Sequence, residues 1–217
     1  MTTKILEKTH RTRLRRKHKR GHYDRATIDT VLDSTAQCHV GYIIDGSPIC
    51  MPTIHWREQD HVYWHASSKG RGLKAAATQS VCLTVTQFDG FVLARSAINH
   101  SANFRSVMVF GEPKLITEPV EKLAKLRGMI EHLFPGRWEM LRPITTQELK
   151  ATSILSLSIE EASCKIRAAG VHDQKEDRSL PIWAGIVPIC RTLGIPEPDP
   201  HNLSSVEMPA HVMAPRI

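Results

Sequence analysis

Residues 38–65 read CHVGYIIDGSPICMPTIHWREQDHVYWH, and this stretch decides the expected fold. Residues 38–44 are rich in β-branched and aromatic side chains, Asp45-Gly46 is a typical hairpin turn, and residues 49–56 can return antiparallel to the first run. Polar residues then lead into a third apolar run at residues 62–65. The pattern therefore predicts three antiparallel strands connected in sequence.

The strand pattern continues towards the C-terminus. Residues 80–87 alternate between apolar and polar side chains, and residues 104–111 alternate again. Between them, Asp89-Gly90 is a second hairpin signal and predicts a separate strand over residues 91–97. Strands that follow one another at such short spacing indicate an antiparallel sheet curled into a barrel or a sandwich.

Helices are expected only at the margins of this sheet. The strongest helical pattern begins at Pro119, repeats apolar residues at helical spacing and ends at Pro135-Gly136. Shorter helices are expected at residues 26–32, 73–78 and 145–150, and residues 153–166 are expected to form a final strand pair or one bent strand.

Composition separates a charged arm from a neutral body. The 217 residues are 41% hydrophobic and 24% charged, which is typical of a globular chain that can bury one core without disulfides or metals. Residues 1–25 hold ten Lys or Arg against two acidic residues, which leaves 19 basic and 20 acidic residues for the rest. We expect a basic arm at 1–25, one domain at 26–190 and a poorly ordered tail at 191–217.

The basic arm is consistent with several roles. It can contact phosphate backbones or an anionic membrane, but a solvated, partly disordered tail is the favoured interpretation, and a nucleic-acid partner is not expected. A mitochondrial presequence ranks last because the arm lacks serine enrichment and a clear apolar face. With no membrane-spanning run, no secretory signal and five cysteines outside any CxxC motif, the expected location is the cytoplasm with reduced thiols.

Several classes of site are excluded by their missing motifs. The sequence has no GxGxxG after a strand, no GxxxxGK[ST] and no GxSxG. A metal shared by His61 and His65 is also excluded, because residues four apart on a strand lie about 13 Å from each other. We therefore expect no resident metal, no dinucleotide fold, no P-loop and no catalytic triad.

Residues 63–73, YWHASSKGRGL, carry the ingredients of a phosphate site. Hydroxyl groups, two cations and the free N–H groups of a helix start all favour an anion, and the glycines let the backbone approach it closely. The alternative is a solvated strand-to-helix connection. A second polar cluster, residues 95–106, is either a binding loop or a corner whose side chains satisfy turn backbone.

Four segments together resemble a known family. MPTIH at 51–55, VYWHASSKGRGL at 62–73, VCLTVTQFDG at 81–90 and NFRSVMVFG at 103–111 occur in the order seen in FMN-binding split-barrel proteins related to pyridoxamine 5'-phosphate oxidase. The resemblance covers about residues 13–189 and is closest to the nitroimidazole-reductase and flavin-nucleotide-binding branch. It implies a mainly β (α+β) fold, an antiparallel split β-barrel with peripheral helices.

The resemblance also implies positions for the cofactor. The strand at 51–55 would lie along the flavin, the loop at 67–71 would receive the FMN phosphate, and His65 would stand at a strand end near the ring as a candidate catalytic residue or a half-buried structural one. The implied cofactor-binding residues are Met51, Pro52, Thr53, Ile54, His65, Ser67, Ser68, Lys69, Arg71, Arg105, Ser106 and Trp183.

Two departures from the oxidase pattern argue against pyridoxamine phosphate as the substrate. Ser106 stands where the oxidases have a flavin-contacting Gln, and the Arg that should follow Trp183 is not clearly present. We therefore expect an FMN-dependent oxidoreductase acting on a small molecule, such as a nitroaromatic, in a homodimer with the cofactor at the subunit interface. The alternative is a non-catalytic flavin- or heme-binding carrier or sensor.

Overall fold

The computed structural model describes residues 4–213 and 215, and its main feature is one antiparallel sheet. The strands are β1 (Gly21–His22), β2 (Gln37–Ile44), β3 (Ser47–Glu58), β4 (His61–Ser67), β5 (Val81–Leu93), β6 (Ser101–Gly111), β7 (Lys114–Leu115), β8 (Thr152–Ser158), β9 (Ala162–Arg167) and β10 (Gly185–Pro188). The helices are α1 (Arg25–Leu32), α2 (Arg71–Ala76), α3 (Pro119–Leu133) and α4 (Thr146–Ala151).

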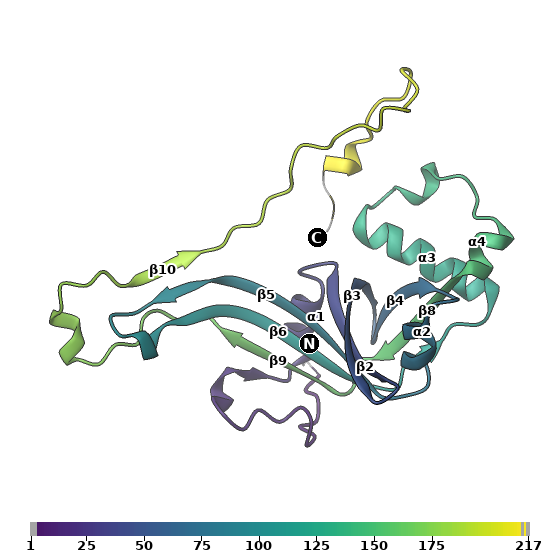
Figure 1. Cartoon of the computed structure of the whole chain (residues 1–217). Coiled ribbons are helices and arrows are strands. Elements are labelled where there is room, and N and C mark those ends of the chain that lie inside the picture. The colour runs from purple at the N-terminus through teal and green to yellow at the C-terminus, as the bar shows by residue number, and fades with distance from the viewer. Residues whose placement is uncertain (1–3, 214, 216–217) are drawn as a thin grey trace.

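The sheet has the order β1-β9-β6-β5-β2-β3-β4-β8-β7, with β10 added to β5. Because β8 also lies against β6, the sheet curls back on itself, as a split barrel does. Figure 1 shows the β5–β6 ribbon extending to one side of the barrel, with α3 and α4 at the opposite side. The expected mainly β fold with peripheral helices is confirmed.

The first hairpin forms as its sequence predicts. Asp45 and Gly46 both have positive φ values, 49° and 77°, which is the geometry that a two-residue hairpin turn requires. Alternate residues of β2 then face the core, where Val40 packs with Leu83 and Val109 at 0–1% exposure. The interior is therefore formed by one face of the sheet and covered by α1.

The prediction of a second hairpin at Asp89-Gly90 is wrong. β5 runs without a turn from Val81 to Leu93, and its register with β6 shifts between Phe88 and Gly90. Gly90 has φ 153°, so the extra residue is absorbed by a β-bulge rather than by a chain reversal. Of the strand predicted at 91–97, residues 91–93 continue β5 and lengthen the β5–β6 ribbon, whereas residues 94–97 are not part of a strand.

The sequence favours a solvated tail for the N-terminal arm, but in the structure parts of the arm pack against the body. Leu6 is 5% exposed and its N–H donates to Tyr23 O, and Arg11 forms an ion pair with Glu161 next to β9. The hydroxyl of Tyr23 donates to Thr12 O at 3.0 Å. Most other side chains of residues 4–20, including the strongly basic stretch at 13–20, remain exposed, so the arm is anchored at a few residues.

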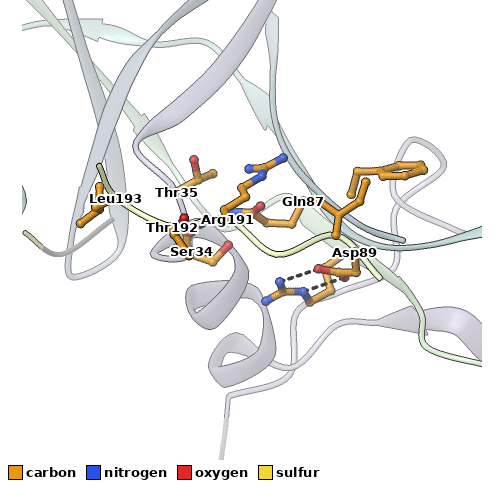
Figure 2. Close-up of a pocket in the computed structure, with 10 residues that line it drawn as sticks. Ser34, Thr35, Gln87, Asp89, Arg191, Thr192 and Leu193 are labelled. Atoms are coloured by element: carbon orange, nitrogen blue, oxygen red, sulfur yellow. Dashed lines mark hydrogen bonds and ion pairs between the residues drawn. The ribbon is translucent and has the colours of Figure 1, made fainter. Parts of the chain in front are cut away.

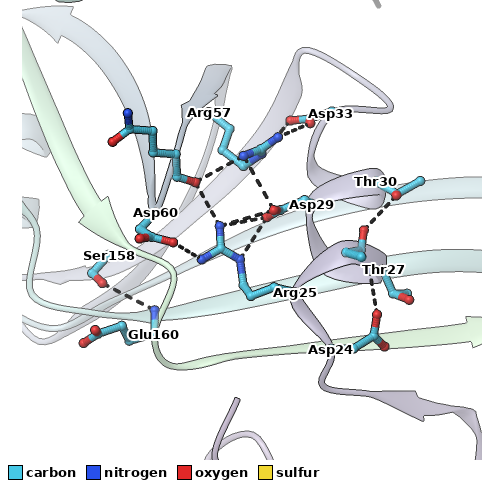
Figure 3. A network of polar contacts seen from close by, with 12 residues as sticks. Asp24, Arg25, Thr27, Asp29, Thr30, Asp33, Arg57, Asp60, Ser158 and Glu160 are labelled. Carbon is cyan, nitrogen blue, oxygen red and sulfur yellow. Dashed lines mark hydrogen bonds and ion pairs between the residues drawn. The ribbon is translucent and has the colours of Figure 1, made fainter. Parts of the chain in front are cut away.

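A network of charged side chains fastens α1 to the turn between β3 and β4 (Figure 3). Arg25 is buried, forms ion pairs with Asp29 and Asp60, and donates to Gln59 O at 2.9 Å. Arg57 on β3 donates from Nε to Asp33 at 2.9 Å. This network positions the C-terminal end of α1 and the loop that follows it, residues 34–36.

His55 holds the same loop from the interior. Its ring nitrogens lie 3.0 Å from Leu32 O and 3.1 Å from Ala36 O, and the residue is 1% exposed. Burial lowers the pKa of this imidazole below its ordinary value of 6.5, against the opposing effect of the two carbonyl contacts. The neutral ring is therefore the folded form at neutral pH.

We predict a pH dependence of stability from His55. Because its folded pKa is lowered, the unfolded chain binds more protons below pH 6.5, so stability is present above that pH and is lost as pH falls towards the folded pKa. The slope from this one group reaches up to about 1.4 kcal/mol per pH unit. The free energy of unfolding, measured by urea denaturation, should fall more steeply between pH 8 and pH 5 for the natural chain than for His55→Gln. Identical pH dependences of the two chains would contradict the role of His55.

No helix in the described part of the chain is long and apolar enough to cross a lipid bilayer.

Candidate functional site

A narrow hollow opens where the middle of β3 meets α2 and the end of β4. Its volume is about 210 Å³. Four residues that the sequence singled out, Met51, Pro52, Thr53 and His65, are among those that line it. The others are Val40, Tyr42, Trp64, Ala66, Gly70, Gly72, Leu73 and Ala76.

A second hollow continues the first along the same strand. It is lined by residues 35–37 and 52–54 and has a volume of about 430 Å³. Both hollows border Pro52 and Thr53, so they are neighbours along β3, and we call the two together the β3 groove. Ile54 lies in the second part of this groove, 43% exposed. The β3 groove is thus long, open and bordered by strand backbone.

The loop at residues 67–71 lies at the α2 end of the β3 groove. Lys69 and Arg71 are exposed, and neither has an ion pair among the residues described. The hydroxyl of Ser67 accepts from Lys69 N at 3.4 Å, and Ser68 N donates to Ala151 O at 2.9 Å, which ties the loop to the end of α4. Two cations and two hydroxyls on a tethered loop are suited to an anion, whereas α2 has only six residues and adds a weak dipole.

Tyr42 is a residue of this site that sequence reasoning missed. It is 7% exposed, it lines the first hollow, and burial raises the pKa of its hydroxyl. The hydroxyl lies directly against Gly72, where an added Cβ would stand 2.2 Å from Tyr42 Oη. In the sequence Tyr42 is one more inward residue of an alternating strand, and nothing there shows that its hydroxyl reaches the glycine loop.

We predict that Gly72→Ala perturbs this end of the groove. The new methyl group would displace the Tyr42 ring or α2, which should lower the free energy of unfolding by about 1–3 kcal/mol. Adding Tyr42→Phe should restore part of the loss because the closest atom is removed. Gly170→Ala is the matched control, since nothing lies within 4 Å of that position. Equal melting temperatures for both alanine variants would contradict this contact.

His65 lines the first hollow of the β3 groove. Its Nδ1 is buried and has no hydrogen-bond partner among the described residues, and its ring centroid lies 6.5 Å from that of Trp56. Burial lowers the pKa of the imidazole below its ordinary value. The ring is therefore neutral at pH 7, and Nδ1 can accept or donate one hydrogen bond, depending on the tautomer.

Of the predicted residues, Met51, Pro52, Thr53, Ile54 and His65 line the β3 groove, and Ser67, Ser68, Lys69 and Arg71 belong to the loop beside it. The other three lie away from both. Arg105 is paired with Asp89 through two hydrogen bonds of 3.0 and 2.7 Å and borders a different pocket. The hydroxyl of Ser106 is 3.5 Å from Lys165 O on β9. Trp183 is 68% exposed and its ring lies against Gly185 at the start of β10. Within one chain, these three side chains are not brought together with the loop at 67–71.

The comparisons with known proteins agree over most of the chain. The family model described as pyridoxamine 5'-phosphate oxidase matches residues 24–166. A comparison with curated proteins gave no match. The chain is similar to the flavocytochrome Anf3 of Azotobacter vinelandii, with 48% identity, a TM-score of 0.92, and coverage of 94% of this chain and 95% of that one.

Two further solved structures are similar. The FAD and heme binding protein of Mycobacterium smegmatis shows 31% identity and a TM-score of 0.85, with coverage of 89% of this chain and 95% of that one. A protein of Bacteroides thetaiotaomicron, named for resistance to 5-nitroimidazole antibiotics, shares the fold at 18% identity and a TM-score of 0.58, with coverage of 67% and 86%. The chain belongs to the pyridoxamine 5'-phosphate oxidase family.

Proposed function

We propose that this chain is a flavin-binding redox protein whose cofactor lies in the β3 groove. The observation that carries the proposal is the placement of two neighbouring hollows along β3, one beside the anion-suited loop at 67–71 and the other beside Thr53 and Ile54. A flavin nucleotide matches this arrangement, because its phosphate is joined by a ribityl chain to a flat ring. The phosphate would contact Lys69 and Arg71, and the ring would lie along β3.

The form of the flavin is proposed from the relatives. The family resemblance implies FMN, whereas the relative with 31% identity is named as binding FAD. Both molecules contain riboflavin 5'-phosphate, so both use the same loop and strand. We favour FAD because that relative covers 89% of this chain.

The flavin, when bound, supplies transfer of electrons or hydride to a small molecule. The residues of this chain position and shield it. Thr53 and Ile54 present strand backbone to the ring edge, Tyr42 closes the end of the groove beside Gly72, and Trp64 forms part of its apolar wall. The neutral imidazole of His65 can hold one hydrogen bond to the ring or to a substrate at Nδ1.

Heme is a second candidate cofactor, because the two relatives described above with more than 30% identity are named as a flavocytochrome and as a FAD and heme binding protein. The unpartnered Nδ1 of His65 is the kind of nitrogen that binds iron. The hollow that His65 lines, of about 210 Å³, is the one in which we place the flavin, so it does not hold a porphyrin at the same time. We derive no step through heme.

We also propose a homodimer. The outer face of the sheet, opposite the core, exposes Ile43, Ile54 and Met108 at 40–46%. Apolar side chains gathered on one sheet face are typical of subunit interfaces. The β3 groove borders this face through Ile54, so a second copy would help to cover the flavin ring. Trp183 and Arg105, which lie away from the groove within one chain, are candidates to reach the partner's site.

The proposal is tested on the purified full-length chain. Its absorption spectrum should show flavin bands, and mass spectrometry of the small molecules released by heat should give FAD or FMN. A Soret band would add heme. A colourless protein that takes up neither flavin after incubation with an excess of each would overturn the proposal.

A further inference from the structure

A polar pocket of about 390 Å³ lies at the end of the β3 groove that is distant from the loop at 67–71. It shares Thr35 with the groove, so the two are neighbours. Figure 2 shows the C-terminal segment passing beside the end of α1 and β5 to form one wall. We call it the strap pocket, and it is lined by Ser34, Thr35, Gln87, Phe88, Asp89, Arg105, Ile189, Arg191, Thr192 and Leu193.

The C-terminal wall is held in place by backbone hydrogen bonds. β10 pairs with β5 from Gly185↔Leu93 to Pro188↔Gly90, and Ile189 N then donates to Asp89 O at 3.0 Å. Gly90 allows this close approach, because an added Cβ would stand 2.6 Å from Val187 O. The next residues, Arg191 to Leu193, therefore leave the sheet directly above the pocket.

The floor of the pocket carries polar groups with fixed orientations. Gln87 is 6% exposed and its Nε2 donates to Ser34 O at 2.7 Å, which leaves the rest of the amide to serve a ligand. Asp89 and Arg105 neutralise each other through their two hydrogen bonds. These groups can orient a ligand by hydrogen bonding, and together they carry no net charge.

Arg191 adds the uncompensated charge. Its guanidinium has no ion pair or hydrogen bond among the residues described, whereas Arg105, the other arginine in the lining, is paired with Asp89. A guanidinium offers two parallel N–H donors to a carboxylate. Phe88, Ile189 and Leu193 supply apolar surface beside it.

We propose that the strap pocket binds a small organic carboxylate next to the flavin ring, with Arg191 as its main anchor, Gln87 as a hydrogen-bonding partner and the apolar side chains against its hydrocarbon part. This inference rests on the proposed flavin site and names the class of substrate that would reach the flavin. The placement follows from the shared lining residues: the strap pocket shares Thr35 with the hollow at residues 52–54, beside which we place the flavin ring.

The test uses benzoate as the probe and its neutral analogue benzamide as the chemical control. Isothermal titration calorimetry on the full-length protein should show benzoate binding and a much weaker signal for benzamide. Arg191→Gln should weaken benzoate binding at least tenfold. The matched control is Arg13→Gln, which removes an exposed and unpaired arginine outside the pocket. Benzoate should also shift the flavin absorption bands, because it would lie beside the ring.

The outcomes separate this inference from the proposed function. Flavin content is measured on the same samples, and calorimetry detects benzoate with or without flavin. If the chain binds flavin but benzoate does not bind, or binds Arg191→Gln and the natural chain equally, the carboxylate site is overturned and the flavin site stands. If benzoate binds in an Arg191-dependent way but no flavin is taken up, the pocket stands and its role beside a flavin is overturned.

Discussion

Replacing Trp56 with alanine is expected to lower the free energy of unfolding by about 3–5 kcal/mol, the usual range for truncating a buried Trp. Trp56 is fully buried and stacks on Tyr63 with ring centroids 5.6 Å apart. Its Nε1 donates to Glu58 at 3.0 Å, and Glu58 in turn forms an ion pair with Lys125 of α3. The truncation would leave a cavity beneath α3 and disconnect the helix from β3.

Trp183→Ala is the matched control for this experiment. The Trp183 side chain is 68% exposed, so its removal should change stability by no more than about 0.5 kcal/mol. Chemical denaturation monitored by far-ultraviolet circular dichroism measures both variants. If Trp56→Ala were as stable as Trp183→Ala, the contacts of Trp56 with Tyr63 and Glu58 would not contribute to folding as we describe.

The double substitution Lys69→Ala with Arg71→Ala is expected to weaken flavin binding by roughly 2–4 kcal/mol, or about 30- to 900-fold. Both cations are exposed on the loop at the end of the β3 groove and have no ion pair among the described residues, so their removal leaves no buried charge behind. Fluorescence quenching of added FMN and FAD by the flavin-free protein measures the dissociation constants. A similar loss for both flavins would assign the loop to their shared phosphate.

Arg15→Ala with Lys19→Ala removes the same charge from the exposed basic arm and serves as the control. It should leave the flavin dissociation constant nearly unchanged and show that net charge alone does not explain the effect. Unchanged affinity in the Lys69 and Arg71 variant would remove this loop from the cofactor site. Melting temperatures within a few degrees of the natural chain would establish that both double variants fold.

Local chemistry made parts of this fold predictable. Asp45-Gly46 can adopt two positive φ values and produces a hairpin wherever two strands flank it. In α4, Thr145 accepts from Glu148 N while Glu148 reaches back to Thr145 N, and this capping box is visible as a short pattern of residues. Arg142 lowers the pKa of Glu148 to about 2, so the cap keeps its charge at acidic pH values at which an ordinary glutamate is protonated.

The same kind of signal failed at Asp89-Gly90. A turn dipeptide permits either a chain reversal or a bulge, and the choice depends on which residues across the sheet face it. Here Asp89 is paired with Arg105 of β6, and the backbone of β10 lies against Gly90. Both contacts come from segments distant in sequence, so the dipeptide alone could not distinguish the two outcomes.

The candidate site divides in the same way. The amino-acid sequence by itself determined the antiparallel fold, the strand at 51–54 and the loop at 67–71, because turn geometry, alternation and charge act over a few neighbouring residues. Only the tertiary structure joined the two hollows into the β3 groove, placed Tyr42 against Gly72, and closed the strap pocket with Arg191. Those contacts depend on the curvature of the sheet and on where β10 pairs, which are decided by packing across the whole chain rather than by any local pattern.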